Sequence, residues 1–291
     1  MAERSYNRGA EDFGNIVNLG HVNVCVPDQK LATAYYVSGL GLTRDPYLMT
    51  GTGNMWVNVG MSQFHLPIGE PQVLRGITGL VIRDREGLLA RLAKARPELT
   101  GTRFDFREGN DRVETVCPWG NRIHCHFPDS GRFGRMALGM PYVELEVPNG
   151  AAEGIARFYR EVFMAPSEVI ADKQGRTTRV LAGDRQHLIF RETDEPQRPY
   201  DGNHFQIYIA NFSGPYRKLQ ELGLVTQESG QHQYRFKDIV DLDTRAVLCT
   251  VDHEVRAMSH PLYGRPLVNR NPSLSARDYV SGQEEASWAM S

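Results

Sequence analysis

The sequence predicts an α+β protein built from four copies of one strand–helix–strand–strand–strand (βαβββ) module. The first observation is an internal repeat: Gly20–Leu42 and Met140–Met164 each hold an alternating strand ending in Val-Pro, a polar turn and an amphipathic helix with an aromatic pair. Alternation with a period of two indicates a half-buried strand, and a period of 3.6 indicates a helix. The second observation is that the repeat continues at a nearly constant offset, with Gln63–Pro71 matching Leu188–Pro196. Such a repeat indicates a duplicated structural unit.

The pattern of each half also predicts two smaller copies within it. A strand over Gly79–Ile82 precedes a helix over Glu86–Ala95, and a strand over Phe205–Ile209 precedes a helix over Pro215–Leu222. The segment 128–139 is rich in Gly, Pro and Ser and is expected to join the halves. The expected organisation is an N-terminal arm (1–16), a first domain (17–130), a second domain (139–256) and a C-terminal tail (257–291).

The composition is that of a globular protein without an obvious macromolecular partner. The 291 residues are 41% hydrophobic and 23% charged, with a formal net charge of -2. No basic block suggests binding to nucleic acid, and no apolar run approaches the ~20 residues that cross a bilayer. The N-terminus lacks a secretory pattern, and the four cysteines form no CxxC pair. We therefore expect reduced thiols and a cytoplasmic location.

Three segments resemble the vicinal oxygen chelate superfamily, which includes glyoxalase I, bleomycin-resistance proteins and extradiol dioxygenases. They are the opening strand His21–Asp28, the helix with Tyr35-Tyr36 followed by Gly39–Leu42, and the turn Pro118–Asn121. The resemblance extends over about residues 18–263, and four modules in one chain look most like the extradiol dioxygenases. Because family members catalyse different reactions, the resemblance implies a fold more strongly than a reaction.

The resemblance implies that two modules pair into one cupped sheet, giving two domains. In this family a metal ion lies in the cup, held by three or four His or Glu side chains from the first and last strands of the paired modules. Pairing within the first half then implies His21, His65 and His124 as metal ligands. His126 lies two residues further on the same strand and competes with His124 for the third place, while Ile77 departs from the four-ligand pattern.

The second half matches the ligand pattern poorly. Tyr142 replaces the first histidine, Phe190 stands in the place of His65, and Thr250 lies near the last ligand position. His204 does match a ligand position, but is interpreted as a structural or substrate-binding residue. We therefore expect the metal in the first half, with the second half as scaffold and cover.

Three neutral imidazoles leave the charge of a bound metal uncompensated, so the metal would polarise a bound oxygen strongly. Fe²⁺ is favoured, and Mn²⁺, Ni²⁺ and Zn²⁺ stay open. No Glu occupies the matched positions of the first half, which disfavours a glyoxalase-like isomerase or lyase. The leading hypothesis is a dioxygenase of extradiol-like type acting on a catechol, an enediol or a dicarbonyl. A metal-free binding or resistance protein is the alternative from another class.

Further residues are assigned to the cup by their position on strands. His126 and Tyr47 are candidates for acid–base catalysis. Trp56, Asn58, Gln63 and His204 are candidates for contacts with a small-molecule substrate. The proline-rich segment Ser259–Pro272 is either a lid over the substrate or a docked tail. Family members often pair through their sheets, which suggests a homodimer, although four modules in one chain can satisfy that pairing internally.

Overall fold

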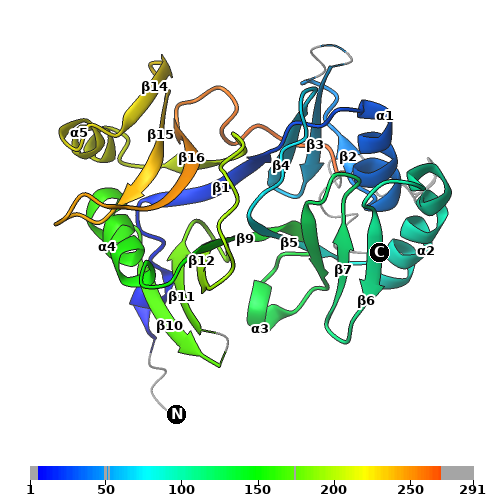
Figure 1. Cartoon of the computed structure of the whole chain (residues 1–291), viewed down its shortest axis with the longest axis horizontal. Helices are drawn as coiled ribbons and strands as arrows, with labels where there is room; N and C mark the ends of the chain where they lie inside the picture. The colour runs from blue at the N-terminus through cyan, green and yellow to red at the C-terminus, as the bar shows by residue number, and fades with distance from the viewer. Residues whose placement is uncertain (1–5, 49–50, 52, 174, 270–291) are drawn as a thin grey trace.

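A computed structural model of the chain describes residues 6–48, 51, 53–173 and 175–269. The strands form two eight-stranded sheets, here called sheet A and sheet B, which cross the molecule one above the other (Figure 1). The order in sheet A is β14 (Val225–Gly230), β15 (Gln233–Val240), β16 (Val247–Ala257), β13 (His204–Ile209), β1 (Ile16–Asn23), β4 (Ser62–Pro67), β3 (Asn54–Val59) and β2 (Thr43–Arg44).

Sheet B has the same architecture. Its order is β10 (Ser167–Asp172), β11 (Gly175–Leu181), β12 (His187–Thr193), β9 (Leu138–Pro148), β5 (Gly76–Ile82), β8 (Arg122–His126), β7 (Arg112–Val116) and β6 (Asp105–Glu108). In each sheet the first strands of two modules run antiparallel at the centre, and each is flanked by the last strand of its own module in parallel. The predicted α+β fold of four βαβββ modules in two cupped sheets is confirmed.

The pairing of the modules differs from the expected one. Module 1 (β1–β4) shares sheet A with module 4 (β13–β16), and module 2 (β5–β8) shares sheet B with module 3 (β9–β12). The expected domains 17–130 and 139–256 therefore each supply one module to each sheet. Pairing of nearby strands is common but not obligatory, and the local pattern of a strand does not say which module it meets.

Neighbouring modules nevertheless pack on each other through their helices. The continuous helical segment α1 (Gln29–Ala32) and η2 (Thr33–Gly39) packs on α2 (Arg85–Ala95), and α4 (Ala152–Phe163) packs on α5 (Ser213–Glu221). Figure 1 shows the first pair at one end of the molecule and the second pair at the other. The remaining helical segments are η1 (Arg8–Glu11), η3 (Arg96–Leu99) and α3 (Ser130–Phe133).

The core fills the space between the helices and the inner faces of the sheets. Two buried tyrosine hydroxyls make hydrogen bonds within it: that of Tyr35 to Thr115 Oγ1 at 3.4 Å, and that of Tyr159 to His253 Nε2 at 2.5 Å. Asp28 begins α1 by accepting hydrogen bonds from the amides of residues 30 and 31, and Asp84 caps α2 in the same way, which satisfies amides that no helical carbonyl can reach. The opposite faces of the sheets are left to form the two cups.

The C-terminal segment Met258–Asn269, here called the strap, leaves β16 and crosses to module 1. Asn58 Nδ2 donates to the Val268 carbonyl at 3.1 Å, and Asn269 Nδ2 donates to the Gly60 carbonyl at 3.1 Å. Residues 1–5 of the expected arm and 270–291 of the expected tail lie outside the described residues. Among the helices that the structure describes, none is long and apolar enough to span a bilayer.

Candidate functional site

The cup of sheet A is lined by polar side chains at alternate strand positions. On β16, Asp252, Glu254 and Arg256 are buried on the cup face, while Val251 and Val255 belong to the core on the other face. The same alternation places polar residues of the other central strands in the cup. They are His21 and Asn23 on β1, Gln63 and His65 on β4, and His204 and Gln206 on β13.

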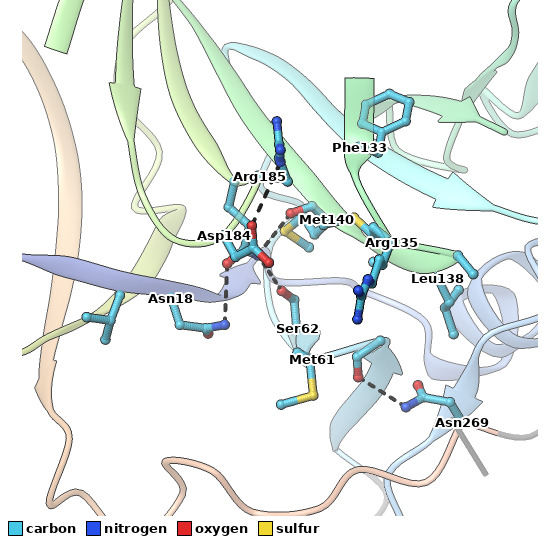
Figure 2. Close-up of a pocket in the computed structure, with 16 residues that line it drawn as sticks. Asn18, Met61, Ser62, Phe133, Arg135, Leu138, Met140, Asp184, Arg185 and Asn269 are labelled. Atoms are coloured by element: carbon cyan, nitrogen blue, oxygen red, sulfur yellow. Dashed lines mark hydrogen bonds and ion pairs between the residues drawn. The ribbon is translucent and has the colours of Figure 1, made fainter. Parts of the chain in front are cut away.

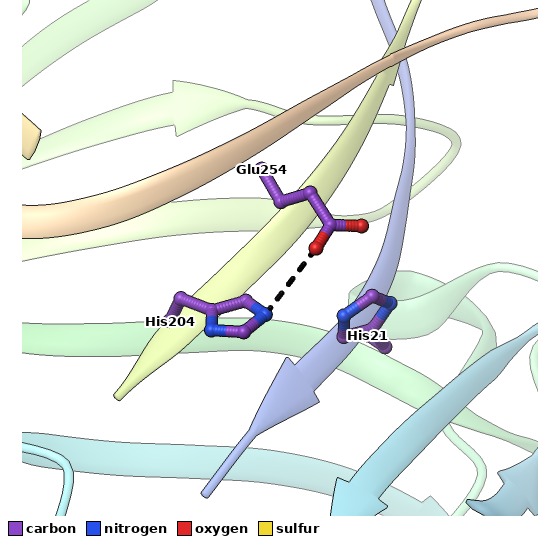
Figure 3. Close-up of side chains that lie close together, drawn as sticks. All are labelled: His21, His204 and Glu254. Atoms are coloured by element: carbon purple, nitrogen blue, oxygen red, sulfur yellow. Dashed lines mark ion pairs between the residues drawn. The ribbon is translucent and has the colours of Figure 1, made fainter. Parts of the chain in front are cut away.

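Strand register brings together residues that are far apart in sequence. His21 lies opposite Gln206 and Asn23 opposite His204 across β1 and β13, and Gln206 lies beside Glu254 across β13 and β16. As a result, potential ligand atoms of His21, His204 and Glu254 all lie within 4.8 Å of one another (Figure 3). His204 Nε2 is 3.4 Å from Glu254 Oε2. The first and fourth modules thus build one cluster.

His21 is a buried, neutral histidine with a ring nitrogen that the described residues leave unpartnered. Its side chain is 2% exposed, and its Nε2 atom finds no hydrogen-bond partner among the described residues. Burial lowers the pKa of His21 well below its ordinary value, and nearby Arg256 adds to that effect while Glu254 opposes it. A buried, neutral imidazole with a free nitrogen is the form in which histidine coordinates metals.

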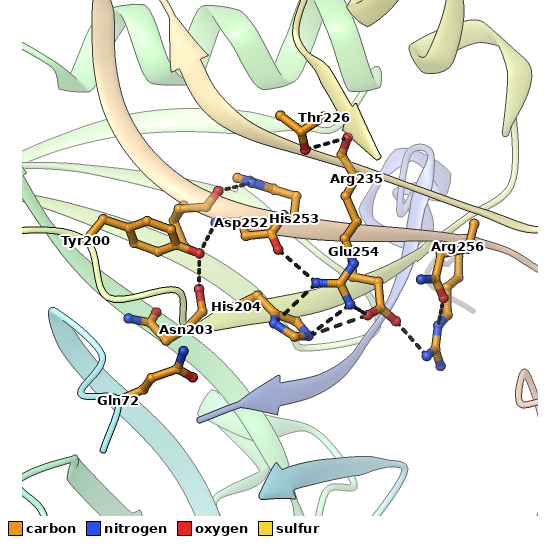
Figure 4. A network of polar contacts seen from close by, with 12 residues as sticks. Gln72, Tyr200, Asn203, His204, Thr226, Arg235, Asp252, His253, Glu254 and Arg256 are labelled. Atoms are coloured by element: carbon orange, nitrogen blue, oxygen red, sulfur yellow. Dashed lines mark hydrogen bonds and ion pairs between the residues drawn. The ribbon is translucent and has the colours of Figure 1, made fainter. Parts of the chain in front are cut away.

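Two arginines hold Glu254 ionised. Arg235 on β15 contacts Glu254 Oε2 and also pairs with Asp252 at 2.8 Å, while Arg256 Nη2 lies 2.6 Å from Glu254 Oε1 (Figure 4). Burial by itself raises the pKa of Glu254, but the hydrogen bond from His204 and the neighbouring His21, Arg256 and Arg235 outweigh it and lower the pKa well below the usual range. The carboxylate is therefore a stable anion.

The residues present fit a divalent cation. Two imidazoles and one carboxylate form the donor set typical of non-haem Fe²⁺ sites with open positions, and the same atoms suit Mn²⁺, Ni²⁺ or Zn²⁺. The buried His21 Nε2 atom without a partner is what a missing ligand bond would leave. The described cluster supplies Glu254 as an anionic ligand in addition to histidines.

His65 lies at the edge of this cluster. Its ring stacks on Trp56 at 3.9 Å between centroids, and its Nε2 is 2.7 Å from Asn54 Oδ1. The centroid of its ring is 5.9 Å from that of His21. Burial and neighbouring His204 lower its pKa to about 3, so the ring is neutral near pH 7. His65 therefore faces the cluster as a neutral base next to the candidate ligands.

The other two histidines that the sequence placed at the metal lie in sheet B. His126 Nε2 is 2.8 Å from the Tyr142 hydroxyl, which is 3.4 Å from His124 Nδ1. Because β8 pairs with β5 and β7 and not with module 4, neither histidine can join His21. The expected set of His21, His65 and His124 is therefore not assembled, and His204 joins His21 in its place.

The remaining sequence candidates have varied surroundings. Tyr47 is 72% exposed and lies outside the cup, with the Arg265 guanidinium 5.5 Å from its ring centroid. Gln63 Nε2 donates to Asn58 Oδ1 at 2.7 Å and to Asp45 Oδ2 at 3.0 Å, so both amides are buried in a network that also receives Arg265 from the strap. Asn58 thus anchors the strap and Gln63 borders the cup.

A cavity of about 350 Å³ lies at the junction of the two sheets, away from the cluster (Figure 2). Its wall includes Gln186, whose Nε2 donates to the carbonyls of Leu19 and Met140 and to the hydroxyl of Ser62 at 3.0–3.2 Å. Gln186 Oε1 accepts from the Leu19 amide at 3.0 Å. This buried amide joins β1 and β4 of sheet A to β9 and the β11–β12 turn of sheet B, and so helps to position His21.

Glu254, Arg235, Arg256 and Gln206 were not identified as site residues from the sequence. In module 4 the sequence places the last ligand position near Thr250. However, β16 extends five residues further at its N-terminal end than β8 does. The first residue of β8, Arg122, pairs with Ile77, whereas the residue of β16 that pairs at the equivalent position, with His204, is its sixth, Asp252. Alternating polar residues at 252, 254 and 256 are the signal that could have revealed the site.

Comparisons with known proteins agree with this architecture. No protein-family profile matches the sequence, and no curated protein is detectably similar to it. Glyoxalase I from Zea mays has a similar structure, with a TM-score of 0.57, 12% identity and coverage of 82% of this chain and 92% of that one. A protein of Bacillus subtilis assigned only provisionally as a dioxygenase gives a TM-score of 0.56 at 13% identity, covering 87% and 91%.

The cppA protein of Streptococcus pneumoniae is also similar, with a TM-score of 0.51, 10% identity and coverage of 84% of this chain and 99% of that one. At such identities the likeness concerns the fold and leaves the reaction open. The chain therefore shares its fold with glyoxalase I from Zea mays.

Proposed function

We propose that the chain is a metal-dependent oxygenase in which His21, His204 and Glu254 hold a divalent cation, with Fe²⁺ favoured. The observation that carries this proposal is the convergence of two imidazoles and one carboxylate within 4.8 Å in a buried cup. When bound, such a cation supplies open positions for a chelating substrate and for dioxygen. The provisional assignment of the Bacillus subtilis protein as a dioxygenase is consistent with this proposal.

His65 is proposed as the residue that orients the substrate by hydrogen bonding. It is neutral, lies beside the cluster and has its Nε2 held by Asn54, so its ring is oriented rather than free to rotate. The stacked Trp56 ring limits access of water to one face of His65.

The charges around Glu254 favour an oxygenase over a glyoxalase-like isomerase. An isomerase of that type needs a carboxylate base that accepts a proton from carbon, and a useful base has a pKa near the working pH. The hydrogen bond from His204, together with His21, Arg256 and Arg235, holds the pKa of Glu254 far below that range. Glu254 is therefore better suited to remain an anionic ligand throughout the reaction than to carry a proton.

The test begins with metal content. Protein loaded anaerobically with Fe²⁺ is expected to retain about one equivalent after desalting, as measured by elemental analysis. His204→Gln and Glu254→Gln are expected to lose it, while His124→Gln and His126→Gln, in the other cup, keep it. Circular dichroism of each variant separates loss of metal from loss of folding. An absence of metal in folded wild-type protein would favour a metal-free binding protein.

The reaction is tested by oxygen uptake. The Fe²⁺-loaded protein is mixed with a panel of catechols and β-diketones in an oxygen electrode, and consumption of oxygen that depends on the organic substrate is expected. Turnover of a substrate without oxygen would instead support an isomerase or lyase. If the metal is bound and no member of the panel leads to oxygen uptake, the oxygenase proposal is wrong.

A further inference from the structure

A second cavity lies inside the cup of sheet A, directly beside the candidate metal site. Its volume is about 180 Å³, and its wall includes His21, Gln63, Gln206 and Arg256. Six water molecules would fill about this volume, at about 30 Å³ each in the liquid. It is smaller than the sites of drug-sized ligands, which begin at roughly 300 Å³. The cavity therefore suits a single-ring or short-chain organic molecule.

A second feature of the cavity wall is the buried amide of Gln206. Its side chain is fully buried, and neither Oε1 nor Nε2 finds a hydrogen-bond partner within the part of the chain that the structure describes. Gly20 makes room for it, because a Cβ atom at that position would lie 1.9 Å from Gln206 Oε1. Buried polar groups in native proteins are normally satisfied, so an amide left unpaired at a cavity wall indicates a polar ligand or ordered water.

Two guanidinium groups belong to the cavity wall. Arg256 from β16 and Arg265 from the strap both line the cavity, whereas no acidic residue belongs to the described lining. Their partners stand outside the lining: Glu254 pairs with Arg256, and the fully buried Asp45 pairs with Arg265. Arg256 also donates to Gln233 Oε1 and to the Tyr208 hydroxyl. With five N–H donors each, both guanidinium groups still keep donors for a further group.

The strap closes the cavity on the side away from the sheet. Leu262, Tyr263, Arg265 and Leu267 all line it, and the Tyr263 ring lies 4.9 Å from the ring of Tyr208 on β13. The strap is attached to module 1 through the hydrogen bond from Asn58 to Val268 and the ion pair between Arg265 and Asp45. A ligand in the cavity would thus be enclosed between sheet and strap, where charge-assisted hydrogen bonds are strong.

We propose that this cavity is the substrate site and that it selects a small organic ligand carrying a carboxylate, which Gln206 Nε2 and the guanidinium of Arg256 or Arg265 bind. The proposal rests on the proposed function for the orientation of the ligand, whose other oxygen atoms face His21 and the metal. Gln206 is then a residue that determines specificity. The selection for a carboxylate, however, can be measured whether or not the protein binds metal.

The test compares probes that differ only in charge. Binding of 3,4-dihydroxybenzoate and 3,4-dihydroxybenzamide is measured by calorimetry, with pyruvate and pyruvamide as a smaller pair. The protein is loaded with Zn²⁺, which is redox-inert, and the His204→Gln variant is measured alongside it. We expect at least one carboxylate to bind about tenfold or more tightly than its amide, as charge-assisted hydrogen bonds to buried groups imply.

The variants assign that preference to the cavity. Gln206→Leu, which preserves size and removes both polar atoms, should reduce affinity for the carboxylate by about tenfold, and Gln227→Leu on the exposed strand β14 should leave it unchanged. Equal affinities within both probe pairs, no binding of any probe, or an unaltered affinity in folded Gln206→Leu would overturn the proposal. A preference that persists in His204→Gln after loss of the metal would support the carboxylate site even if the metal-dependent function were wrong.

Discussion

The two cups have the same architecture and opposite contents. The register that brings His21 near His204 in sheet A brings Tyr142 near Ile77 in sheet B. The last strands supply Glu254 and His65 in sheet A, and at the same register positions His124 and Ile189 in sheet B. The positions of four potential ligands in the cup of sheet A are thus taken by a tyrosine, two isoleucines and one histidine in the cup of sheet B.

The cup of sheet B is occupied by its own side chains. Tyr142 crosses β5 so closely that a Cβ atom on Gly79 would lie 2.4 Å from its ring. Its charged residues are paired with each other, as in the ion pairs Arg191–Glu144 and Arg122–Glu146. In sheet A, His21 and Gln206 keep buried polar atoms for which the described residues offer no partner. The cup of sheet A thus presents a candidate metal ligand and an amide to a ligand, whereas Tyr142 fills part of the cup of sheet B.

The largest effect that separates the cups is expected in metal binding. Loss of His204 removes a neutral ligand, and loss of Glu254 removes an anionic ligand that offsets the charge of the cation. In either case affinity should fall by about a hundredfold and retention after desalting should disappear. The corresponding change at His124 in sheet B should have no effect. Elemental analysis of the four variants checks this, and metal loss in His124→Gln would contradict the difference between the cups.

The next largest effect is expected on stability, from the loss of Arg235, which pairs with the two buried carboxylates of β16. Arg235→Met leaves Asp252 and Glu254 buried with fewer cationic partners. Breaking a buried ion pair from one side costs roughly 3–5 kcal/mol, so the free energy of unfolding of the metal-free protein should fall by about 3 kcal/mol. A saturating divalent cation should recover part of that loss, since it supplies positive charge at the same carboxylate. Denaturation by urea, with and without Zn²⁺, measures both effects.

A smaller effect, on pH dependence, is expected in sheet B. Burial and Arg132 lower the pKa of His126 to about 4. The unfolded chain binds a proton below about pH 6.5, whereas the native ring does not until about pH 4, so this group contributes stability that is present above pH 6.5 and lost as the pH falls toward 4. Between pH 7 and pH 5 the loss should be roughly 1–2 kcal/mol. His126→Gln should make that part of the pH profile flatter, and an unchanged slope would show that His126 does not contribute.

The smallest effect is expected at the half-exposed ion pairs of sheet B. Arg122 and Glu146 are paired with side chains that are 46% and 32% exposed. Solvent-exposed pairs contribute about 0–1 kcal/mol, so Arg122→Ala should change the midpoint of thermal unfolding only slightly. Scanning calorimetry measures this. A loss as large as that in Arg235→Met would show that the ion pairs of both cups have equal weight.

The modules themselves could be predicted from the sequence, because their signals are local. The alternating strand before Pro27, the helix after Asp28 and their copies after Pro148 depend on neighbours a few residues away. His21, His65 and His204 could be recognised as cup residues for the same reason, since inward and outward positions alternate along each strand. These predictions hold whichever modules share a sheet.

The composition of the site was decided by the pairing of modules that lie far apart in the chain. Hydrogen bonds between strand edges are made by the backbone, which is the same in every module, so local sequence does not distinguish a partner in module 2 from one in module 4. Pairing of β1 with β13 brings Glu254 and His204 to His21 and leaves His124 in the other cup. The sequence alone determined four modules and a histidine in the first strand, and only the tertiary structure decided which histidine and which carboxylate meet it.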